Sequence, residues 1–137
     1  MKNIGVWLDR EKAQIITLKN NRIMMNTIHS EIENYHITGG SGTRFKGGPQ
    51  DVVQDSRYLE REKHQLKIYF KEIASLLKNA DSIVIFGPAE TNQKFKKELI
   101  GNYKTINAKV MAVKKSDSMT DNQLKAWVKD FFDSKKH

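Results

Sequence analysis

The stretch "ADSIVIFGP", residues 80–88, decides how the rest of the chain can be arranged. Its centre is an unbroken apolar run of β-branched and aromatic residues, and turn-forming residues bound it on both sides. A strand that is apolar on both faces is typical of a parallel sheet, in which crossover helices cover the faces. The stretch therefore predicts a buried, parallel strand.

Helical patterns lie on both sides of this strand. From Arg57 to about Lys78, most apolar residues recur at three- or four-residue steps, which predicts a helix capped by Asp55 or Ser56. After the strand, Thr91 can begin a helix that runs through roughly Ile100, and Gly101 is a plausible stop. The strand is therefore flanked by two helices, as a crossover arrangement requires.

The C-terminal part of the chain predicts one more strand and one more helix. Residues 105–113, "TINAKVMAV", alternate well enough for a strand, and Thr120 with Gln123 fits the capping box of a final helix. Aromatic residues on the predicted helical stripes are assigned to the core, whereas the side of Trp7 is left open. They are Tyr69, Phe70, Trp127 and Phe131.

The N-terminal part predicts an antiparallel meander. Residues 3–9, "NIGVWLD", and 13–18, "AQIITL", are short β-rich runs, and residues 9–12, "DREK", form the turn between them. In that turn Asp9 can hydrogen-bond its own backbone. Residues 22–37 show patchier alternation and are predicted to continue the ladder as a third strand.

The resulting order is three strands followed by α-β-α-β-α. A meander followed by alternating helices and strands predicts an α/β domain with a single mixed sheet of about five strands and helices packed on it. That layout is ribonuclease-H-like. We expect residues 1–137 to form one such domain, because the chain shows no internal repeat and no linker long enough to divide it.

A glycine-rich segment interrupts this order. Residues 38–50, "TGGSGTRFKGGPQ", contain five glycines and one proline in thirteen residues, which neither a helix nor a strand interior tolerates. We predict a long exposed loop with a mobile tip, extending to about residue 54 before the long helix. A glycine loop of this kind is also common as a plain flexible connection.

Composition places the protein among basic, cysteine-free chains. Its 137 residues carry a net charge of +8 and no Cys, and seven basic residues against one acidic residue lie in residues 93–115. Such an excess attracts polyanions, although a solvated Lys-rich surface is an equally simple explanation. The chain shows no secretory signal and no apolar run of the roughly 18 to 20 residues that cross a bilayer, so we expect a cytoplasmic location.

Three segments in order carry a resemblance to a known family. They are residues 5–18, "GVWLDREKAQIITL", then "GGPQ" at 47–50 ahead of Arg57 and "EREKHQLKIYFKEIA" at 60–74, and finally "DSIVIFGPAETNQKFKKEL" at 81–99. Together they resemble the central, Gly-Gly-Gln-bearing domain of eukaryotic and archaeal class-1 peptide chain release factors. The related bacterial release-factor-like and host-attachment-type proteins are similar too. The resemblance covers nearly the whole chain, and it rests on the order of the segments.

The resemblance implies a partner and a reaction. In that family the Gly-Gly-Gln tip enters the peptidyl-transferase centre of the large ribosomal subunit, where it helps to hydrolyse the ester of peptidyl-tRNA. For this chain it implies binding to the ribosome and tRNA, with Gly47, Gly48 and Gln50 as catalytic residues in ribosome rescue. We expect no metal and no cofactor, because the four His residues lack metal-ligand spacing and the glycine segments do not follow the phosphate-loop pattern, and we expect no DNA or membrane partner.

Two features depart from the family pattern. Pro49 separates Gly48 from Gln50, so the amide of Gln50 is moved by one residue. A displacement of about 1 Å can cost roughly a hundredfold in rate. The chain also leaves no room for a stop-codon-reading domain or a GTPase-contacting domain, so ordinary codon-specific termination is not expected.

Basic and aromatic residues are predicted to contact RNA, by pairing with phosphates or stacking on a base. They are Arg44, Phe45 and Lys46 in the loop, Arg57, Arg61, His64, Lys67 and Lys71 on the first helix, and Lys94, Lys96 and Lys97 on the second. The alternative for the helical residues is a solvent-exposed face with weak surface pairs.

Two other functions remain open. A non-catalytic ribosome- or RNA-binding factor, acting in dormancy or quality control, would use the same surfaces without any chemistry. A metal-dependent, ribonuclease-H-like nuclease is more remote, because two-metal catalysis needs clustered carboxylates and the four His residues lack metal-ligand spacing. The candidate acids for that nuclease are Asp9, Glu31, Glu60, Asp81 and Asp117.

Overall fold

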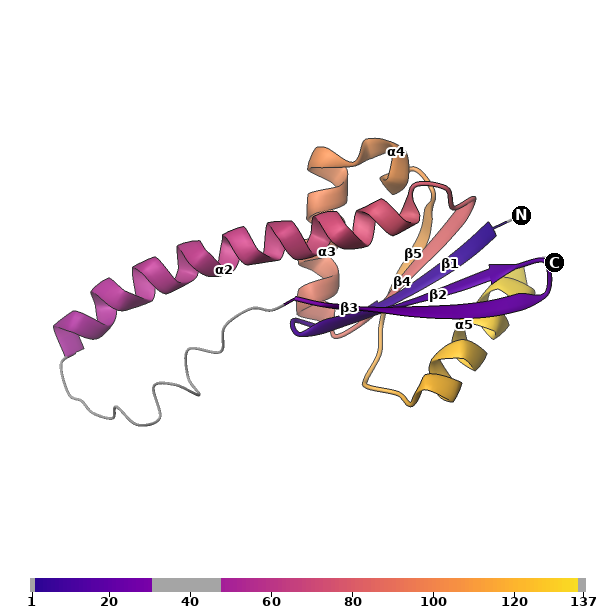
Figure 1. Ribbon diagram of the computed structural model, residues 1–137, viewed down its shortest axis with the longest axis horizontal. Helices are drawn as coiled ribbons and strands as arrows, with labels where there is room; N and C mark the ends of the chain where they lie inside the picture. The colour runs from indigo at the N-terminus through magenta and orange to yellow at the C-terminus, as the bar shows by residue number, and fades with distance from the viewer. Residues whose placement is uncertain (1, 31–47, 136–137) are drawn as a thin grey trace.

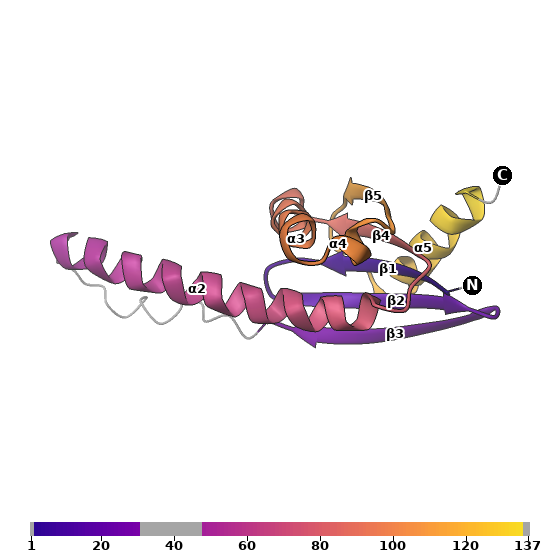
Figure 2. The same ribbon diagram turned by 90° about the horizontal axis from the view of Figure 1, so that it is seen from above.

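Five strands form a single sheet with helices on both of its faces (Figures 1 and 2). The computed structural model describes residues 2–30 and 48–135, with residues 48–59 and Lys135 described by their backbone alone. The strand order is β3-β2-β1-β4-β5. This arrangement confirms the mixed α/β sheet of ribonuclease-H-like layout that the order of elements predicts.

The antiparallel half of the sheet matches the predicted meander. It consists of β1 (Lys2–Leu8), β2 (Lys12–Lys19) and β3 (Arg22–His29), paired β1 with β2 and β2 with β3. The prediction extended the third strand to residue 37, but β3 ends at His29, and residues 31–37 lie outside the described part of the chain.

The parallel half adds β4 (Ser82–Gly87) beside β1, and β5 (Val110–Lys115) beside β4. The parallel strand predicted from residues 80–88 is therefore confirmed. The last strand begins later than the predicted residue 105, because Lys104–Asn107 form a short helix, α4. Ile106 of this helix is buried in the core. An apolar residue at this position was therefore also consistent with the predicted strand.

The three longer helices also differ from the prediction at their ends. They are α2 (Gly48–Leu77), α3 (Ala89–Asn102) and α5 (Asp121–Lys135). The prediction that Asp55 or Ser56 caps the first helix is wrong, since both lie inside α2. A proline in the first turn lacks only an N–H that has no partner there, so Pro49 permits this early start.

The ends of α3 and α5 show which capping signals were informative. Thr91 lies in the first turn of α3, which begins after Pro88, and Gly101 lies inside its last turn. In contrast, the predicted capping box of α5 is confirmed. The Thr120 amide donates to Gln123 Oε1 at 2.9 Å, and the Gln123 amide donates to Thr120 Oγ1 at 3.2 Å.

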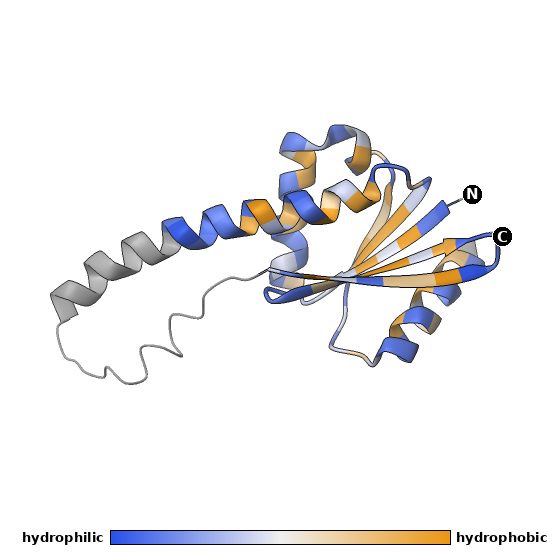
Figure 3. Cartoon of the chain, viewed as in Figure 1, coloured by the Kyte–Doolittle hydropathy of each residue, from blue (hydrophilic) through white to orange (hydrophobic). Residues whose placement is uncertain are grey.

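Two apolar clusters hold the helices on the sheet, and apolar colouring is concentrated in its central strands (Figure 3). On one face, α2 and α3 cover alternate residues of β1 and β2. On the other face, α5 covers Trp7, Ile16, Val84 and Phe86, so Trp7 belongs to the core. No helix among the described residues is long and apolar enough to span a membrane.

Gly5 lies on the α5 side of β1, where the helix approaches the strand closely. A Cβ atom built at this position would come within 2.4 Å of Cγ2 of Val128, which is itself completely buried. Glycine inside a strand commonly marks such a close approach. The position of α5 therefore depends on the absence of a side chain at residue 5.

We expect Gly5→Ala to lower the free energy of unfolding by about 1–3 kcal/mol, because the added methyl group overpacks the contact with Val128. Urea unfolding of Gly5→Ala, Val128→Ala and the double variant measures the coupling. The double variant should be less destabilised than the sum of the two single variants. Strictly additive effects would contradict this account of Gly5.

Candidate nucleic-acid interface

Helix α2 reaches far beyond the sheet (Figures 1 and 2). Its 30 residues correspond to a length of about 45 Å. Its C-terminal part packs on the domain, where Tyr69, Ile73 and Leu77 are almost completely buried. Glu60 and Arg61 are already exposed, so the helix leaves the body of the domain close to them.

Two polar contacts fix α2 to the turn between β1 and β2. Arg10 in the turn forms an ion pair with Glu62 and donates from Nε to Glu62 Oε2 at 2.6 Å. About two helical turns further along α2, the Tyr69 hydroxyl donates to the Asp9 carbonyl at 2.9 Å. These contacts lie where the helix leaves the body, so they help to set its direction.

The turn itself is built as the sequence predicted. Asp9 Oδ1 accepts hydrogen bonds from the Glu11 and Lys12 amides, each at 2.8 Å. The Asp9 carboxylate is thus engaged in the turn. Asp81 lies at the opposite end of the parallel strands, where it accepts from the Lys2 amide at 2.6 Å.

Carboxylates do not gather into a metal site within residues 2–30 and 60–134. No three His, Asp or Glu side chains in this part of the chain are close enough to hold an ion. Of the candidate nuclease acids, Asp9 follows β1, Asp81 precedes β4, and Glu60 is exposed on α2, while Glu31 lies outside the described residues. The geometry gives no support to two-metal cleavage by these acids.

A groove of about 540 Å³ runs between α2 and α3. Leu66 and Phe70 supply its apolar lining, and Phe70 stacks at a tilt against Phe95 of α3, with ring centroids 5.2 Å apart. Polar and charged side chains from both helices surround this lining. They are Glu62, Lys63 and Lys67 from α2, and Lys94, Lys97, Glu98 and Asn102 from α3.

The charge of this groove is positive. Of its two acidic residues, Glu62 is paired with Arg10, and Glu98 accepts a hydrogen bond from Asn102 at 2.9 Å. Lys94 also forms a 3.3 Å pair with Glu90, one turn earlier in α3. Four lysines therefore face a groove in which one acid is already neutralised, an environment suited to an anionic chain.

The basic surface continues around α2. Lys63, Lys67 and Lys71 are spaced by four residues, so they follow one side of the helix. His64 is exposed next to this row, whereas Arg61 lies further around the helix. The groove and this row form one cationic surface, which we call the α2–α3 surface.

Some of the predicted RNA-contact residues lie together in the structure and others lie apart. Lys67, Lys94 and Lys97 come together in the groove, but Lys96 turns away and hydrogen-bonds Asn107 Oδ1 of α4. Sequence analysis missed Lys63, although its four-residue spacing from Lys67 was a usable signal. Its proximity to α3 required the tertiary structure.

The predicted tip residues lie at or beyond the start of α2. Gly48 and Gln50 belong to its first turn, at the end farthest from the sheet (Figure 1). Residues 44–47, which include the predicted Arg44, Phe45, Lys46 and Gly47, lie outside the described part of the chain, as does the side chain of Arg57. The tip therefore starts from a helix end, about nine residues earlier than the sequence predicted.

Solved structures contain this fold. Pelota from Thermoplasma acidophilum superposes with a TM-score of 0.54 and 20% identity, over 94% of this chain and 32% of that protein. An archaeal translation termination factor, aRF1, superposes with a TM-score of 0.58 and 13% identity, over 88% of this chain and 31% of that protein. The fold is release-factor-like.

The fold shared with this chain makes up only part of those two larger proteins. This chain spans about a third of the length of Pelota and of aRF1. No model of a known protein family matches the sequence, and no curated protein matches it. At these identities the likeness concerns the fold, so the function has to be argued from the surfaces described above.

Lys96 and Lys97 offer a matched test of the α2–α3 surface, because they are adjacent and differ in direction. We expect Lys97→Ala to weaken binding of a ribosomal RNA fragment and to reduce the slope of log K against log salt by about 0.7–0.9, the effect of one lost phosphate contact. Lys96→Ala should leave the slope unchanged. Fluorescence anisotropy over a salt series measures both variants, and equal slopes for the two would contradict the assignment.

Tyr69 provides a test of the α2 attachment. Burial, with a smaller contribution from Asp9, raises the pKa of Tyr69 well above its ordinary value. The folded protein therefore keeps a proton that the unfolded chain loses near pH 10, so stability falls as pH rises past about 10. Tyr69→Phe should cost about 1 kcal/mol at neutral pH, because the hydrogen bond to Asp9 is lost, and should show a shallower alkaline decline. Chemical unfolding between neutral and alkaline pH measures this, and parallel declines would contradict it.

Proposed function

We propose that this protein is a ribosome-binding, release-factor-like translation factor that presents the start of α2 to peptidyl-tRNA. The observation that carries the proposal is a long helix which leaves the domain with the Gly-Pro-Gln sequence at its far end (Figure 1). A body of this size cannot enter a narrow RNA cavity, whereas a single helix of about 10–12 Å diameter can. The archaeal translation termination factor aRF1 has a similar fold, which supports a role for this protein in translation.

The α2–α3 surface supplies the binding energy in this proposal. Its lysines pair with ribosomal RNA phosphates and release counterions, and the apolar lining at Leu66 and Phe70 accepts a base or sugar. The row Lys63, Lys67 and Lys71 extends the contact along α2. Large-subunit RNA and tRNA are the partners that fit a helix inserted in this way.

Hydrolysis is the activity that we propose for the tip. The first four amides of a helix have no acceptor within it, and the amide of Gln50 is one of them in α2. Such an amide points outward at the positive end of the helix dipole, where it can stabilise the oxyanion formed when water attacks the peptidyl-tRNA ester. Gly47 and Gly48 allow close approach of the backbone to the ester. No side chain is proposed as a base.

Pro49 favours a second candidate, a factor that binds the ribosome without chemistry. Proline has no N–H, so the tip offers one donor fewer than a sequence without it. Pro49 also moves the Gln50 amide along the chain, and catalysis is sensitive to such displacements. In this second candidate the α2–α3 surface keeps its role and the tip blocks the cavity, as in dormancy or quality control.

Release of labelled peptide from purified peptidyl-tRNA–ribosome complexes separates the two candidates. We expect wild type to release peptide and Gln50→Pro, which removes the backbone N–H that stabilises the oxyanion, to reduce the rate by about 10²–10³, the typical effect of removing one such donor. The matched control is Gln50→Ala, because it removes the side chain at the same position of α2 and keeps the backbone N–H. A second variant deletes Pro49 and should restore the spacing of the family tip.

The outcomes are distinct. Release that Gln50→Pro abolishes and Gln50→Ala retains supports hydrolysis by the tip. Co-sedimentation with ribosomes without release, in wild type and in the Pro49 deletion, supports the non-catalytic candidate. Absence of co-sedimentation even at low salt would exclude both, because phosphate contacts are strongest there.

A further inference from the structure

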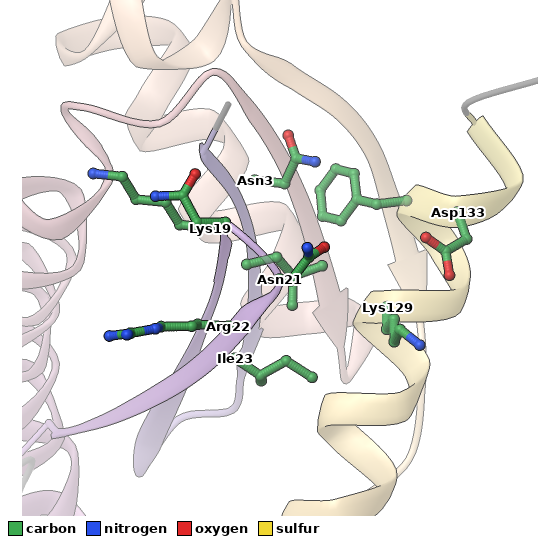
Figure 4. Close-up of a pocket in the computed structure, with 10 residues that line it drawn as sticks. Asn3, Lys19, Asn21, Arg22, Ile23, Lys129 and Asp133 are labelled. Carbon is green, nitrogen blue, oxygen red and sulfur yellow. The ribbon is translucent and has the colours of Figure 1, made fainter.

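A second cleft lies at the end of the sheet away from the projecting part of α2. It is formed by the β2–β3 turn, the first residues of β1 and the last turns of α5, and its volume is about 460 Å³ (Figure 4). That volume is within the range of small-molecule sites. Leu18, Ile23 and Phe132 form its apolar walls, and Ile23 is 40% exposed.

Asn3 is the unusual residue in this cleft. It lies on the same side of β1 as Gly5 and Trp7, facing α5, where the neighbouring core residues are apolar. Among the described residues its Oδ1 is buried and accepts no hydrogen bond. A buried acceptor without a donor lowers stability, so its retention in the wall of a cleft calls for a functional explanation.

Polar groups on the rim face the same space. Asn21, in the left-handed conformation with φ of 64°, places its side chain over the cleft, opposite Lys129 on α5 (Figure 4). Lys19 and Arg22 extend away from α5 toward an adjoining hollow that they line on the other side of the turn. The cleft is therefore amide-rich inside, with Lys129 and Asp133 of α5 on one rim, and the cationic groups of Lys19 and Arg22 lie toward the adjoining hollow.

We propose that this cleft binds a nucleoside phosphate. A nucleobase matches the interior, because its edge carries N–H donors for Asn3 Oδ1 and acceptors for the Asn21 amide, and its faces pack on Ile23 and Leu18. The phosphate then lies toward Lys19 and Arg22. The source is either a free nucleotide or one nucleotide of a single-stranded RNA.

This inference is independent of the proposed function. The cleft shares no residue with the α2–α3 groove, and it lies at the other end of the sheet from the part of α2 that projects. Loss of nucleotide binding is therefore expected to leave peptide release and ribosome co-sedimentation unchanged, so failure of either proposal can be recognised separately.

Isothermal titration with AMP, CMP, GMP and UMP, and with a mixed-sequence single-stranded oligoribonucleotide, tests the proposal on the full chain. We expect saturable binding of at least one probe by wild type. Asn3→Leu, which keeps the side-chain size and removes the buried acceptor, should weaken that binding at least about tenfold. The same change should raise the midpoint of thermal unfolding by roughly 2–6 °C, because an unsatisfied buried group is removed.

Asn21→Gly is the second variant, since glycine keeps the left-handed turn and removes the amide; it too should weaken binding. Asn122→Ala, at the exposed first turn of α5 and outside both the cleft and the α2–α3 groove, is the matched control and should bind as wild type does. Binding of the mononucleotides indicates a free ligand, whereas binding of RNA alone that Asn3→Leu weakens indicates a nucleotide within a strand. No saturable binding of any probe, or binding unchanged in both Asn3→Leu and Asn21→Gly, would overturn the proposal.

Discussion

The packing of the C-terminal half of α2 on the sheet is the constraint on which the rest of the molecule depends. Tyr69, Ile73 and Leu77 bury this half against β1 and β2, and Arg10 with Glu62 holds the point where the helix departs. These contacts do two things at once. They complete the core on one face of the sheet, and they bring α2 beside α3, so that lysines far apart in sequence share one groove. A change that loosened this packing would disturb stability and the charged surface together.

Features with local signals were predictable from the sequence. The strand at residues 80–88 is apolar on both faces, the Asp9 turn depends on a side chain that bonds to amides two and three residues on, and Thr120 and Gln123 cap α5 reciprocally. Each signal lies within a few residues, so no knowledge of the tertiary structure was needed. The order of these elements then restricted the topology, because parallel strands require crossovers. The mixed sheet followed from these local features.

Features that depend on distant partners were not predictable. Ile106 is buried from a helical turn, which the periodicity of residues 105–113 could not distinguish from a strand. The α2–α3 groove unites Lys63 and Lys97 only because both helices cover the same face of the sheet. Likewise, Asn3 looks like an ordinary strand residue until α5 covers that side of β1 and leaves its oxygen without a donor. These arrangements are set by tertiary packing, which no single stretch of sequence records.

The projecting part of α2 shows how packing and reach are connected. An isolated helix of about 12–15 residues is marginal in water, because its first turn fixes several backbone angles for a single hydrogen bond. In α2 the packed half already provides that nucleus, so each further residue toward Gly48 adds one hydrogen bond without a new nucleation cost. The early start permitted by Pro49 then determines where the helix ends. The position of the Gly-Pro-Gln end relative to the sheet therefore depends on the core contacts at Tyr69, Ile73 and Leu77.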